Sequence, residues 1–239
     1  MLVLALDTTT SSGSCALVRD GRILCEQIND APNAHAEHLP GDLIALLDRA
    51  AITLSAIDAF AVATGPGSFT GLRIGIATMQ GLAFAQGKPL VGVSAFDALA
   101  RIAGRGQLVA TWVDAWRGEV FAALYEDGHE VEAPVVARPE VLLESLRERR
   151  PRPVRPTLFI GDGALVHAET IRRTLGDVAR LADPPTPPLA GVMAMLAAAQ
   201  LPHGDHSPHA IRPLYIRRTD AELAHDARSQ SPKDARSLR

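Results

Sequence analysis

Several features are scarce or missing in this sequence of 239 residues, and each absence excludes a class of protein. It has two cysteines, Cys15 and Cys25, in apolar stretches without C-x-x-C spacing, so we expect buried free thiols in a reducing compartment. No apolar run approaches about 20 residues, which argues against a membrane-spanning helix. No basic region precedes the first short apolar run, so we expect no signal peptide and a cytoplasmic location.

An excess of positive charge is also missing. Lysine and arginine together number 24 against 27 acidic residues, and only Lys88 and Lys233 are lysines. A chain with a net charge of −3 is not expected to bind nucleic acid tightly by itself, because phosphate contacts supply most non-specific affinity. One basic loop, residues 147–156, is a candidate for tRNA contact inside a complex through Arg147, Arg149, Arg150, Arg152 and Arg155.

The sequence is organised around a glycine-rich stretch. An apolar run at 59–63 predicts a strand, and the apolar segment 72–86 predicts a helix. Gly65, Gly67 and Gly71 between them allow positive φ and the close approach of another group. Backbone N–H groups at such a helix start can bind an anion, but the spacing matches neither G-x-G-x-x-G nor a P-loop. A tight strand-to-helix turn that needs glycine only for its geometry explains the stretch equally well.

The side chains of this turn have limited chemistry. Arg73 is the nearest cation for a bound anion. Ser68 and Thr70 lie where hydroxyls cap a helix start, and we interpret both as caps. No G-x-S-x-G elbow and no Ser–His–Asp pattern supports a nucleophile, so a serine hydrolase is excluded.

The predicted elements follow one another in the same order twice. For the first half we expect strands at 2–6, 13–18, 23–28, 59–63 and 90–93 and helices at 36–50, 53–56, 72–86 and 95–103. For the second half we expect strands at 108–113, 120–125, 131–137 and 158–160 and helices at 140–146, 164–175 and 189–200. Pro40 fits the first long helix only in its first turn.

Spacing supports a duplication of this βββαβα unit. Asp7 and Asp114, each at a strand end, are 107 residues apart, and so are the hairpin glycines Gly21 and Gly128. Duplicated βββαβα lobes describe the actin-like ATPase fold of the α/β class, shared by Hsp70 chaperones and sugar kinases. In that fold a nucleotide lies between the lobes, and the turn aspartates contact phosphate and metal.

We therefore expect three regions along the chain. Residues 1–105 form an N-terminal lobe with partner-binding helices, and residues 106–218 form a C-terminal lobe. Residues 219–239 are polar and poor in apolar side chains, which predicts a mobile tail.

Four stretches resemble the TsaB (YeaZ) family: residues 5–9, 61–75, 114–121 and, at the C-terminal signature, 213–218. The resemblance implies a role in making N6-threonylcarbamoyladenosine in tRNA beside the anticodon. It implies a heterodimer with the paralogue TsaD, which carries the metal and transfers the threonylcarbamoyl group, and a link to the small ATPase TsaE. It also implies a homodimer when the chain is alone, and contact with tRNA only through the complex.

The family resemblance implies no catalytic residue and no metal site in this chain. The H-x-x-x-H pair of TsaD is absent, and the histidines of 35–38 and 203–209 are better read as polar surface residues. The isolated chain is expected to bind no cofactor, although ATP or ADP could lie at a shared interface. The residues of a vestigial phosphate-binding turn are Asp7, Thr8, Thr9, Thr10, Gly65, Gly67, Ser68, Thr70, Gly71, Arg73 and Asp114.

An enzyme of the same fold is the alternative. A carbamoyltransferase or a small-metabolite kinase would use Asp7 and Asp114 for phosphate and metal. The missing histidine pair argues against the first, and the lack of a substrate-binding insertion argues weakly against the second.

A stripe of small residues along the helix 72–86 favours a scaffold. Each glycine inside a helix costs roughly 1 kcal/mol against alanine, so we expect a close neighbour, either the chain's own sheet or a partner helix. A leucine stripe on the helix 36–50 adds to this surface. The predicted interface residues are Leu39, Leu43, Leu46, Leu47, Gly71, Gly75, Thr78, Gly81, Leu82 and Ala85.

Overall fold

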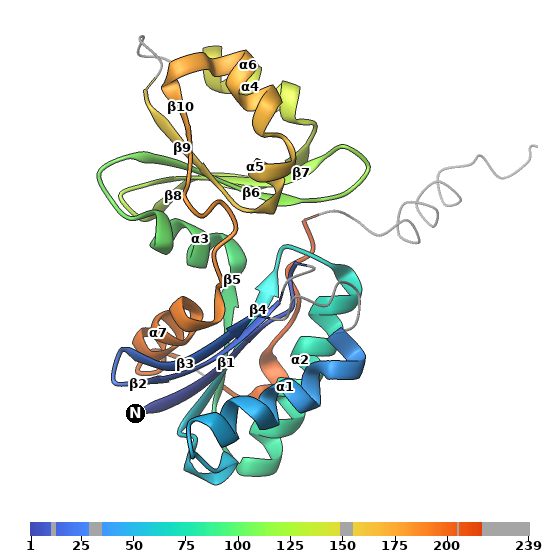
Figure 1. The fold of residues 1–239 in the computed structure, drawn as a ribbon, viewed down its shortest axis with the longest axis vertical. Coiled ribbons are helices and arrows are strands. Elements are labelled where there is room, and N and C mark those ends of the chain that lie inside the picture. The colour runs from blue at the N-terminus through green and yellow to red at the C-terminus, as the bar shows by residue number, and fades with distance from the viewer. Residues whose placement is uncertain (11–12, 29–34, 149–154, 205, 217–239) are drawn as a thin grey trace, which may run out of the picture.

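The computed structural model describes residues 1–10, 13–28, 35–148, 155–204 and 206–216, and the side chains of helix α1 from residue 39 onward (Figure 1). Among the helices of these ranges, none combines the length and the apolar character needed to cross a membrane.

The first lobe is built on a five-stranded sheet in the order β3-β2-β1-β4-β5. β1 to β3 are antiparallel, whereas β4 and β5 run parallel to β1. β1 is buried along its whole length, because helices cover both faces of the sheet. The elements are β1 (Leu2–Asp7), β2 (Ser14–Arg19), β3 (Arg22–Ile28), α1 (His35–Arg49), a 3-10 turn (Leu54–Ala56), β4 (Ala59–Gly65), α2 (Phe69–Gln86), β5 (Leu90–Ser94) and α3 (Ala95–Ala103).

The second lobe repeats this arrangement with a sheet in the order β10-β9-β6-β7-β8. β6 pairs antiparallel with β7 and parallel with β9, as β1 does with β2 and β4, which confirms the predicted duplication. Its elements are β6 (Leu108–Asp114), β7 (Val120–Glu126), β8 (His129–Ala137), α4 (Pro139–Glu148), β9 (Thr157–Ile160), α5 (Asp162–Val166), α6 (Ala168–Leu175), a 3-10 turn (Gly176–Val178) and β10 (Ala179–Leu181).

Three sequence-based expectations about elements need correction. The helix expected at 164–175 is two helices, α5 and α6, which meet at His167. Pro40 lies in the second turn of α1 rather than the first, so the helix lacks one i→i−4 hydrogen bond there. The three-residue strand β10 was not expected.

The two lobes share one hydrophobic core through α3. This helix lies between the sheets in Figure 1 and packs on β4, β5, β6 and β9. The Tyr125 hydroxyl of the second lobe donates a 2.6 Å hydrogen bond to Asp97 on α3, and burial raises the Tyr125 pKa well above its usual range. The same core cluster contains residues of both sheets, so the lobes are packed against each other rather than joined by a bare linker.

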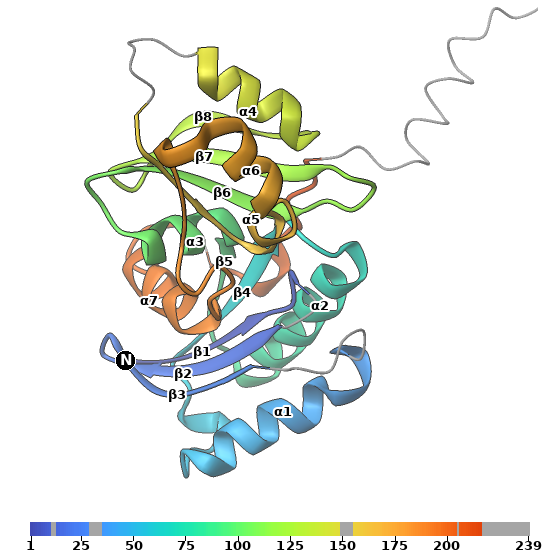
Figure 2. The ribbon, with the colours of Figure 1, turned by 45° about the horizontal axis from the view of Figure 1, so that its top comes forward.

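The chain then returns to the first lobe. Helix α7 (Ala190–Gln200) packs on β1, β2 and β4, so the predicted range 106–218 includes a helix that lies on the first sheet. After α7 a short 3-10 turn (Pro208–Ala210) leads into residues that run beside α2. Figure 2 shows α1 and α2 on one side of the first sheet and α7 on the other.

Candidate functional site: the turns at the cleft and the outer face of α1 and α2

The turn after β1 is closed by its own aspartate. Asp7 is buried, and its Oδ1 accepts hydrogen bonds from the backbone N–H of Thr9 at 2.9 Å and from the Thr9 hydroxyl at 2.7 Å. This is the local aspartate turn that favours Asp at a strand end. The geometry gives Asp7 a structural partner on its own turn.

The glycine-rich stretch packs directly on this turn. The Ser68 N–H donates to the Thr9 carbonyl at 2.7 Å, and the Thr8 hydroxyl donates to the Gly71 carbonyl at 2.8 Å. A Cβ on Gly71 would lie 2.2 Å from the Thr8 carbonyl oxygen, and one on Gly75 would lie 2.3 Å from the Thr8 hydroxyl oxygen. These glycines therefore allow a close approach between α2 and the turn after β1.

The start of α2 is capped from within the chain. Ser68 is the N-cap, and its hydroxyl accepts from the Gly71 N–H at 3.2 Å, which confirms the predicted role of Ser68. Thr70 is an exposed residue inside the first turn, so the expectation that it caps the helix is wrong. Because the N–H groups of Ser68 and Gly71 already have acceptors, a phosphate would have to displace them.

Arg73 contacts two aromatic side chains. Its Nε donates to the Tyr215 hydroxyl at 3.1 Å, and its guanidinium carbon lies 3.8 Å from the centre of the Phe69 ring. The Phe69 and Tyr215 rings are 5.5 Å apart. The nearest cation to the glycine turn thus belongs to an exposed aromatic cluster, and its place in a vestigial phosphate-binding turn stays a prediction.

The second lobe has a counterpart of this arrangement. Asp114 Oδ1 accepts from the Trp116 N–H at 3.0 Å, as Asp7 does from Thr9. Asp162 Oδ1 accepts from the N–H groups of Asp114 and Gly163, both at 2.9 Å. Burial raises the pKa of the Asp162 carboxyl, these two N–H groups oppose the rise, and the carboxylates of Asp114 and Asp7 add to it.

Between the lobes lies a cavity of about 220 Å³. This is below the roughly 300–1,000 Å³ typical of pockets that bind small molecules. The residues that line it are Asp7, Thr9, Thr10, Ser14, Ile28, Leu99, Val113, Gly161, Asp162, Leu165, Thr186, Pro187, Pro188 and Leu189.

Several backbone donors at this cavity have acceptors within the chain. The Gly161 N–H donates to the Pro185 carbonyl at 2.8 Å. At the start of α7 the Ser14 hydroxyl accepts from the N–H groups of Leu189 and Ala190, and Glu26 accepts from Gly191. A phosphate bound at these N–H groups would have to displace their present acceptors. Within the described residues, no group of three His, Cys, Asp or Glu side chains is placed to hold a metal.

The leucine stripe of α1 faces inward. Leu39, Leu43 and Leu46 are at most 5% exposed and belong to the core of the first lobe, while Leu47 packs at its edge. The prediction that these leucines form a partner surface needs correction, because periodicity alone does not show which neighbour a stripe contacts.

The small-residue stripe of α2 divides in two. Gly71 and Gly75 are buried against Thr8, as described above, whereas Gly81 and Ala85 are exposed. A Cβ added at Gly81 would meet no atom within 4 Å. Of the other two predicted interface residues, Thr78 and Leu82 are partly buried.

Sequence reasoning missed other members of this surface. α1 and α2 pack side by side, and both expose small or apolar side chains. Ile44 is 59% exposed. In the sequence, the one indication of this exposure is that Ile44 directly follows Leu43, which belongs to the buried stripe of α1. We call the following set the outer face of α1 and α2: Gly41, Ile44, Ala45, Ala77, Gly81 and Ala85.

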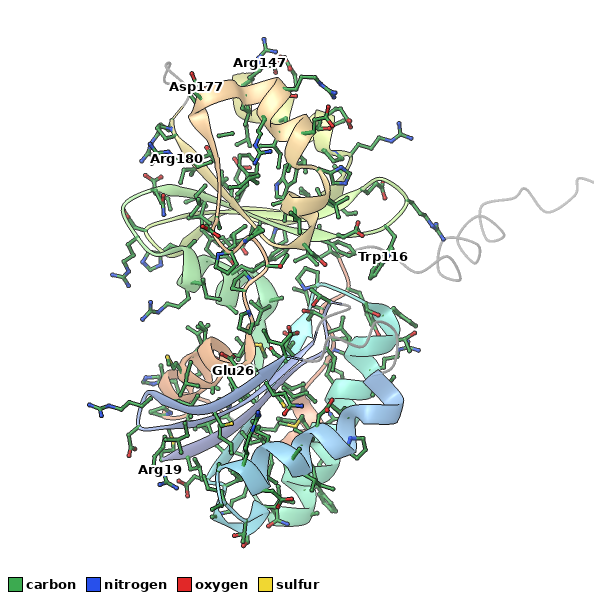
Figure 3. All side chains as sticks on the ribbon, in the orientation of Figure 1. Arg19, Glu26, Trp116, Arg147, Asp177 and Arg180 are labelled. Atoms are coloured by element: carbon green, nitrogen blue, oxygen red, sulfur yellow. The ribbon has the colours of Figure 1, made fainter. Side chains whose placement is uncertain are left out.

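The remaining candidates are surface features or lie outside the described residues. His206 Nε2 is 3.1 Å from the Gln200 carbonyl, and His209 packs against the Phe84 ring. Arg155 forms an ion pair with Glu126, and Arg147 lies at the end of the second lobe away from the cleft (Figure 3). Outside the described residues are the side chains of His35 and His38, the arginines of 149–152, and the tail 219–239.

Comparisons with known proteins agree with the fold and identify the family. The sequence model of the family TsaD, tRNA N6-adenosine threonylcarbamoyltransferase, matches residues 27–225. The tRNA threonylcarbamoyladenosine biosynthesis protein TsaB of Bacillus subtilis is 31% identical over 178 residues, which cover 74% of this chain and 77% of that protein.

Two solved structures resemble this chain, one in sequence and fold and the other in fold alone. The structure of YeaZ from Pseudomonas aeruginosa has a TM-score of 0.73 and 31% identity, covering 90% of this chain and 99% of that chain. The ethanolamine utilization protein EutJ from Carboxydothermus hydrogenoformans, at 14% identity, has a TM-score of 0.55 over 82% of this chain and 90% of its own, which bears on the fold alone. With its duplicated actin-like lobes and these relatives, the chain belongs to the TsaB (YeaZ) family, within the wider group that includes TsaD.

Proposed function

We propose that this chain is a non-catalytic subunit of the complex that forms N6-threonylcarbamoyladenosine in tRNA. It binds and supports a TsaD-like catalytic paralogue, together with a TsaE-like ATPase, in the cytoplasm. The name of the TsaB relative supports the pathway. The observation that carries the scaffold role is the outer face of α1 and α2, centred on Gly81.

Gly81 differs from Gly71 and Gly75, the two buried glycines of α2. Glycine in a helix interior costs roughly 1 kcal/mol against alanine, and a glycine is usually retained where another backbone comes close. Gly71 and Gly75 have such a neighbour in Thr8, but nothing lies within 4 Å of a Cβ at Gly81. A partner helix on this face explains the residue, and the exposed Ile44 on the neighbouring helix α1 adds apolar area to bury.

The partner shares the fold of this chain. Because the chain matches the TsaD family model over residues 27–225, a TsaD-like partner can present an equivalent pair of helices. A second copy of the chain can use the same face, so the homodimer and the heterodimer compete for it.

The cleft of this chain supports assigning the chemistry to the partner. Asp7 and Asp114 each accept a hydrogen bond within their own turns, and the Gly161 N–H at the cavity donates to the Pro185 carbonyl. In this proposal the isolated chain holds no nucleotide, ATP or ADP lies at a shared interface in the complex, and tRNA is bound through the complex.

A drop-out assay tests the function. TsaD, TsaE, threonylcarbamoyl-AMP synthase, tRNA, threonine, bicarbonate and ATP are incubated with and without this chain, and modified adenosine is quantified. The proposal predicts product only when both this chain and TsaD are present. Modification without TsaD would show that the chain is itself the transferase. If the chain has no effect on its cognate partners, the proposed pathway is wrong.

A further inference from the structure

The last described segment of the chain, residues 206–216, lies along the flank of α2 and is called here the C-terminal strap. The Leu90 N–H donates to the His206 carbonyl at 3.0 Å, where the strap begins. Gln80 Nε2 then donates to the carbonyls of Pro208 and Ile211, at 2.8 and 3.3 Å. The strap is therefore pinned to α2 by side-chain contacts and to the sheet by backbone contacts.

The far end of the strap is fixed beside the first turn of α2. The Leu214 N–H donates to the Thr64 carbonyl at 2.7 Å, and the Tyr215 hydroxyl accepts from Arg73. The strap thus runs antiparallel to α2, from Phe84 near the C-terminal end of the helix to Phe69 at its start. This arrangement gives the last part of the chain a definite place on the surface.

The strap and α2 together expose an aromatic cluster of Phe69, Arg73 and Tyr215. We call these three residues, with the exposed Leu214 that precedes Tyr215 in the strap, the anchor. Phe69, Leu214 and Tyr215 are between 41% and 44% exposed. The side chains of Phe69 and Tyr215 are held in place, because Arg73 stacks on Phe69 and donates to Tyr215. Rigid aromatic and arginine side chains of this kind are enriched among the residues that contribute most to protein–protein binding.

The anchor continues the outer face of α1 and α2. One exposed ridge of α2 consists of residues spaced four apart: Phe69, Arg73, Ala77, Gly81 and Ala85. With a rise of about 1.5 Å per residue, Phe69 and Ala85 each lie about 12 Å from Ala77. An interface that buries about 800 Å² per partner has a radius of about 16 Å, so an interface centred on this ridge reaches the anchor.

We propose that the anchor is part of the surface that binds the fold-related protein partner, with the C-terminal strap contributing Leu214 and Tyr215 directly. This inference rests on the proposed function, because the same partner covers the outer face of α1 and α2. A protein fits the anchor better than an RNA does, because the Arg73 guanidinium already has Phe69 and Tyr215 as neighbours and Leu214 adds apolar surface. The strap therefore has a binding role in addition to packing.

Affinity measurements on single variants test the inference. The full chain is titrated with purified TsaD-like partner by calorimetry, for the wild type and for Phe69→Ala, Tyr215→Ala and Tyr215→Phe. We expect Phe69→Ala and Tyr215→Ala to weaken binding about tenfold or more, and Tyr215→Phe, which keeps the ring, to weaken it less. Val141→Ala, at a 62% exposed position on α4, is the matched surface control and should bind like the wild type.

Hydrogen exchange supplies a measurement that needs no variant. The amides of the strap should exchange more slowly in the complex than in the free chain, while those of α4 should not change. Melting temperatures of the variants show whether any loss of binding comes from unfolding.

The possible outcomes separate this inference from the proposed function. If wild type binds the partner, Gly81→Leu loses binding and the anchor variants bind normally, the strap lies outside the interface and the inference is wrong. If anchor variants keep the partner but lose tRNA from the assembled complex, the cluster is an RNA-binding surface, which also overturns it. If wild type does not bind the partner at all, the proposed function fails and the inference fails with it.

Discussion

The two lobes end their fourth strand in the same way and then diverge. After β4, Gly71 and Gly75 bring α2 against the turn that follows β1. After β9, Gly161 and Gly163 bring α5 against the end of β6, with a Cβ on Gly161 only 2.1 Å from the Trp112 carbonyl oxygen. α2 then continues for 18 residues, whereas α5 ends after five, just before His167.

This difference distinguishes the glycine turns, which stabilise the fold, from the ridge of α2, which we propose binds a partner. The glycine turns occur in both lobes, and both serve close packing, against the turn after β1 in the first lobe and against the end of β6 in the second. The exposed ridge from Phe69 to Ala85 lies on α2. The corresponding helices of the second lobe, α5 and α6, are each too short to form a ridge of that length. We therefore assign stability to the turns and partner binding to the ridge.

The largest effect is expected at the turns. Gly71→Ala and Gly161→Ala each place a Cβ about 2 Å from a backbone carbonyl oxygen, at 2.2 and 2.1 Å, and a backbone atom cannot move aside cheaply. Gly161 also has a φ of +112°, which a side chain disfavours. We expect each change to lower the free energy of unfolding by about 2–4 kcal/mol, measured by urea denaturation. Wild-type stability in either variant would show that the turns tolerate side chains and that close packing does not explain their glycines.

The second effect concerns binding rather than stability. Gly81→Leu adds a side chain where the isolated chain has open space, so the fold should be kept while a partner helix can no longer approach. We expect affinity for the TsaD-like partner, and for a second copy of the chain, to fall at least about tenfold, or 1.4 kcal/mol. Analytical ultracentrifugation of the wild type and the variant measures both. A variant that unfolds would place Gly81 in the core instead.

A third, smaller effect has the opposite sign. Gly81→Ala should raise the free energy of unfolding of the isolated chain by about 0.5–1 kcal/mol, because alanine favours the helix and its Cβ meets nothing. Thermal denaturation of the monomer is the measurement, with Gly75→Ala as the matched change on the buried side of α2. If Gly75→Ala also stabilises, the contrast between the two sides of the helix is wrong.

The smallest effect tests the cleft. Burial raises the pKa of Asp162 in the folded chain. At a pH between the ordinary aspartate pKa and this raised pKa, Asp162 is ionised in the unfolded chain but still protonated in the folded chain. Ionisation of Asp162 therefore opposes folding increasingly as the pH rises through that interval, and the penalty is complete above it. Asp162→Asn keeps an oxygen acceptor for Asp114 and Gly163 and removes the charge. We expect the variant to be slightly more stable at neutral pH, with the gain disappearing as the pH falls below the ordinary value.

One result for Asp162→Asn would contradict the conclusion that ionised Asp162 opposes folding. If the wild type becomes more stable than Asp162→Asn as the pH rises, the ionised carboxylate has a stabilising partner, and the cleft favours a bound cation after all. Melting temperatures of both proteins across the acidic range distinguish the two cases.

Much of this architecture could be predicted from local sequence patterns. Helix α3 has the predicted bounds, Ala95–Ala103, and the repeated strand–Asp pattern led to the correct duplicated fold. Ser68 was recognised as a cap because capping depends on a hydrogen bond three residues away along the chain. These features are set by neighbours in sequence, so they can be inferred from it.

What sequence reasoning missed depends on distant neighbours. The leucines of α1 and the glycines of α2 form stripes of similar appearance, yet Leu43 faces the core and Gly81 faces outward. Periodicity gives the position of a stripe but not what it contacts. The contact between Arg73 and Tyr215 joins residues 142 positions apart, and no spacing rule anticipates it.

The central claim is that this chain acts on its pathway by binding its partner through the ridge of α2. The most direct test is to titrate wild type and Gly81→Leu into the modification assay with limiting TsaD. The account predicts that modified adenosine rises with wild type in proportion to complex formed, and that Gly81→Leu needs at least about tenfold more chain for the same yield. Full modification by a Gly81→Leu chain that no longer pairs with TsaD would contradict it.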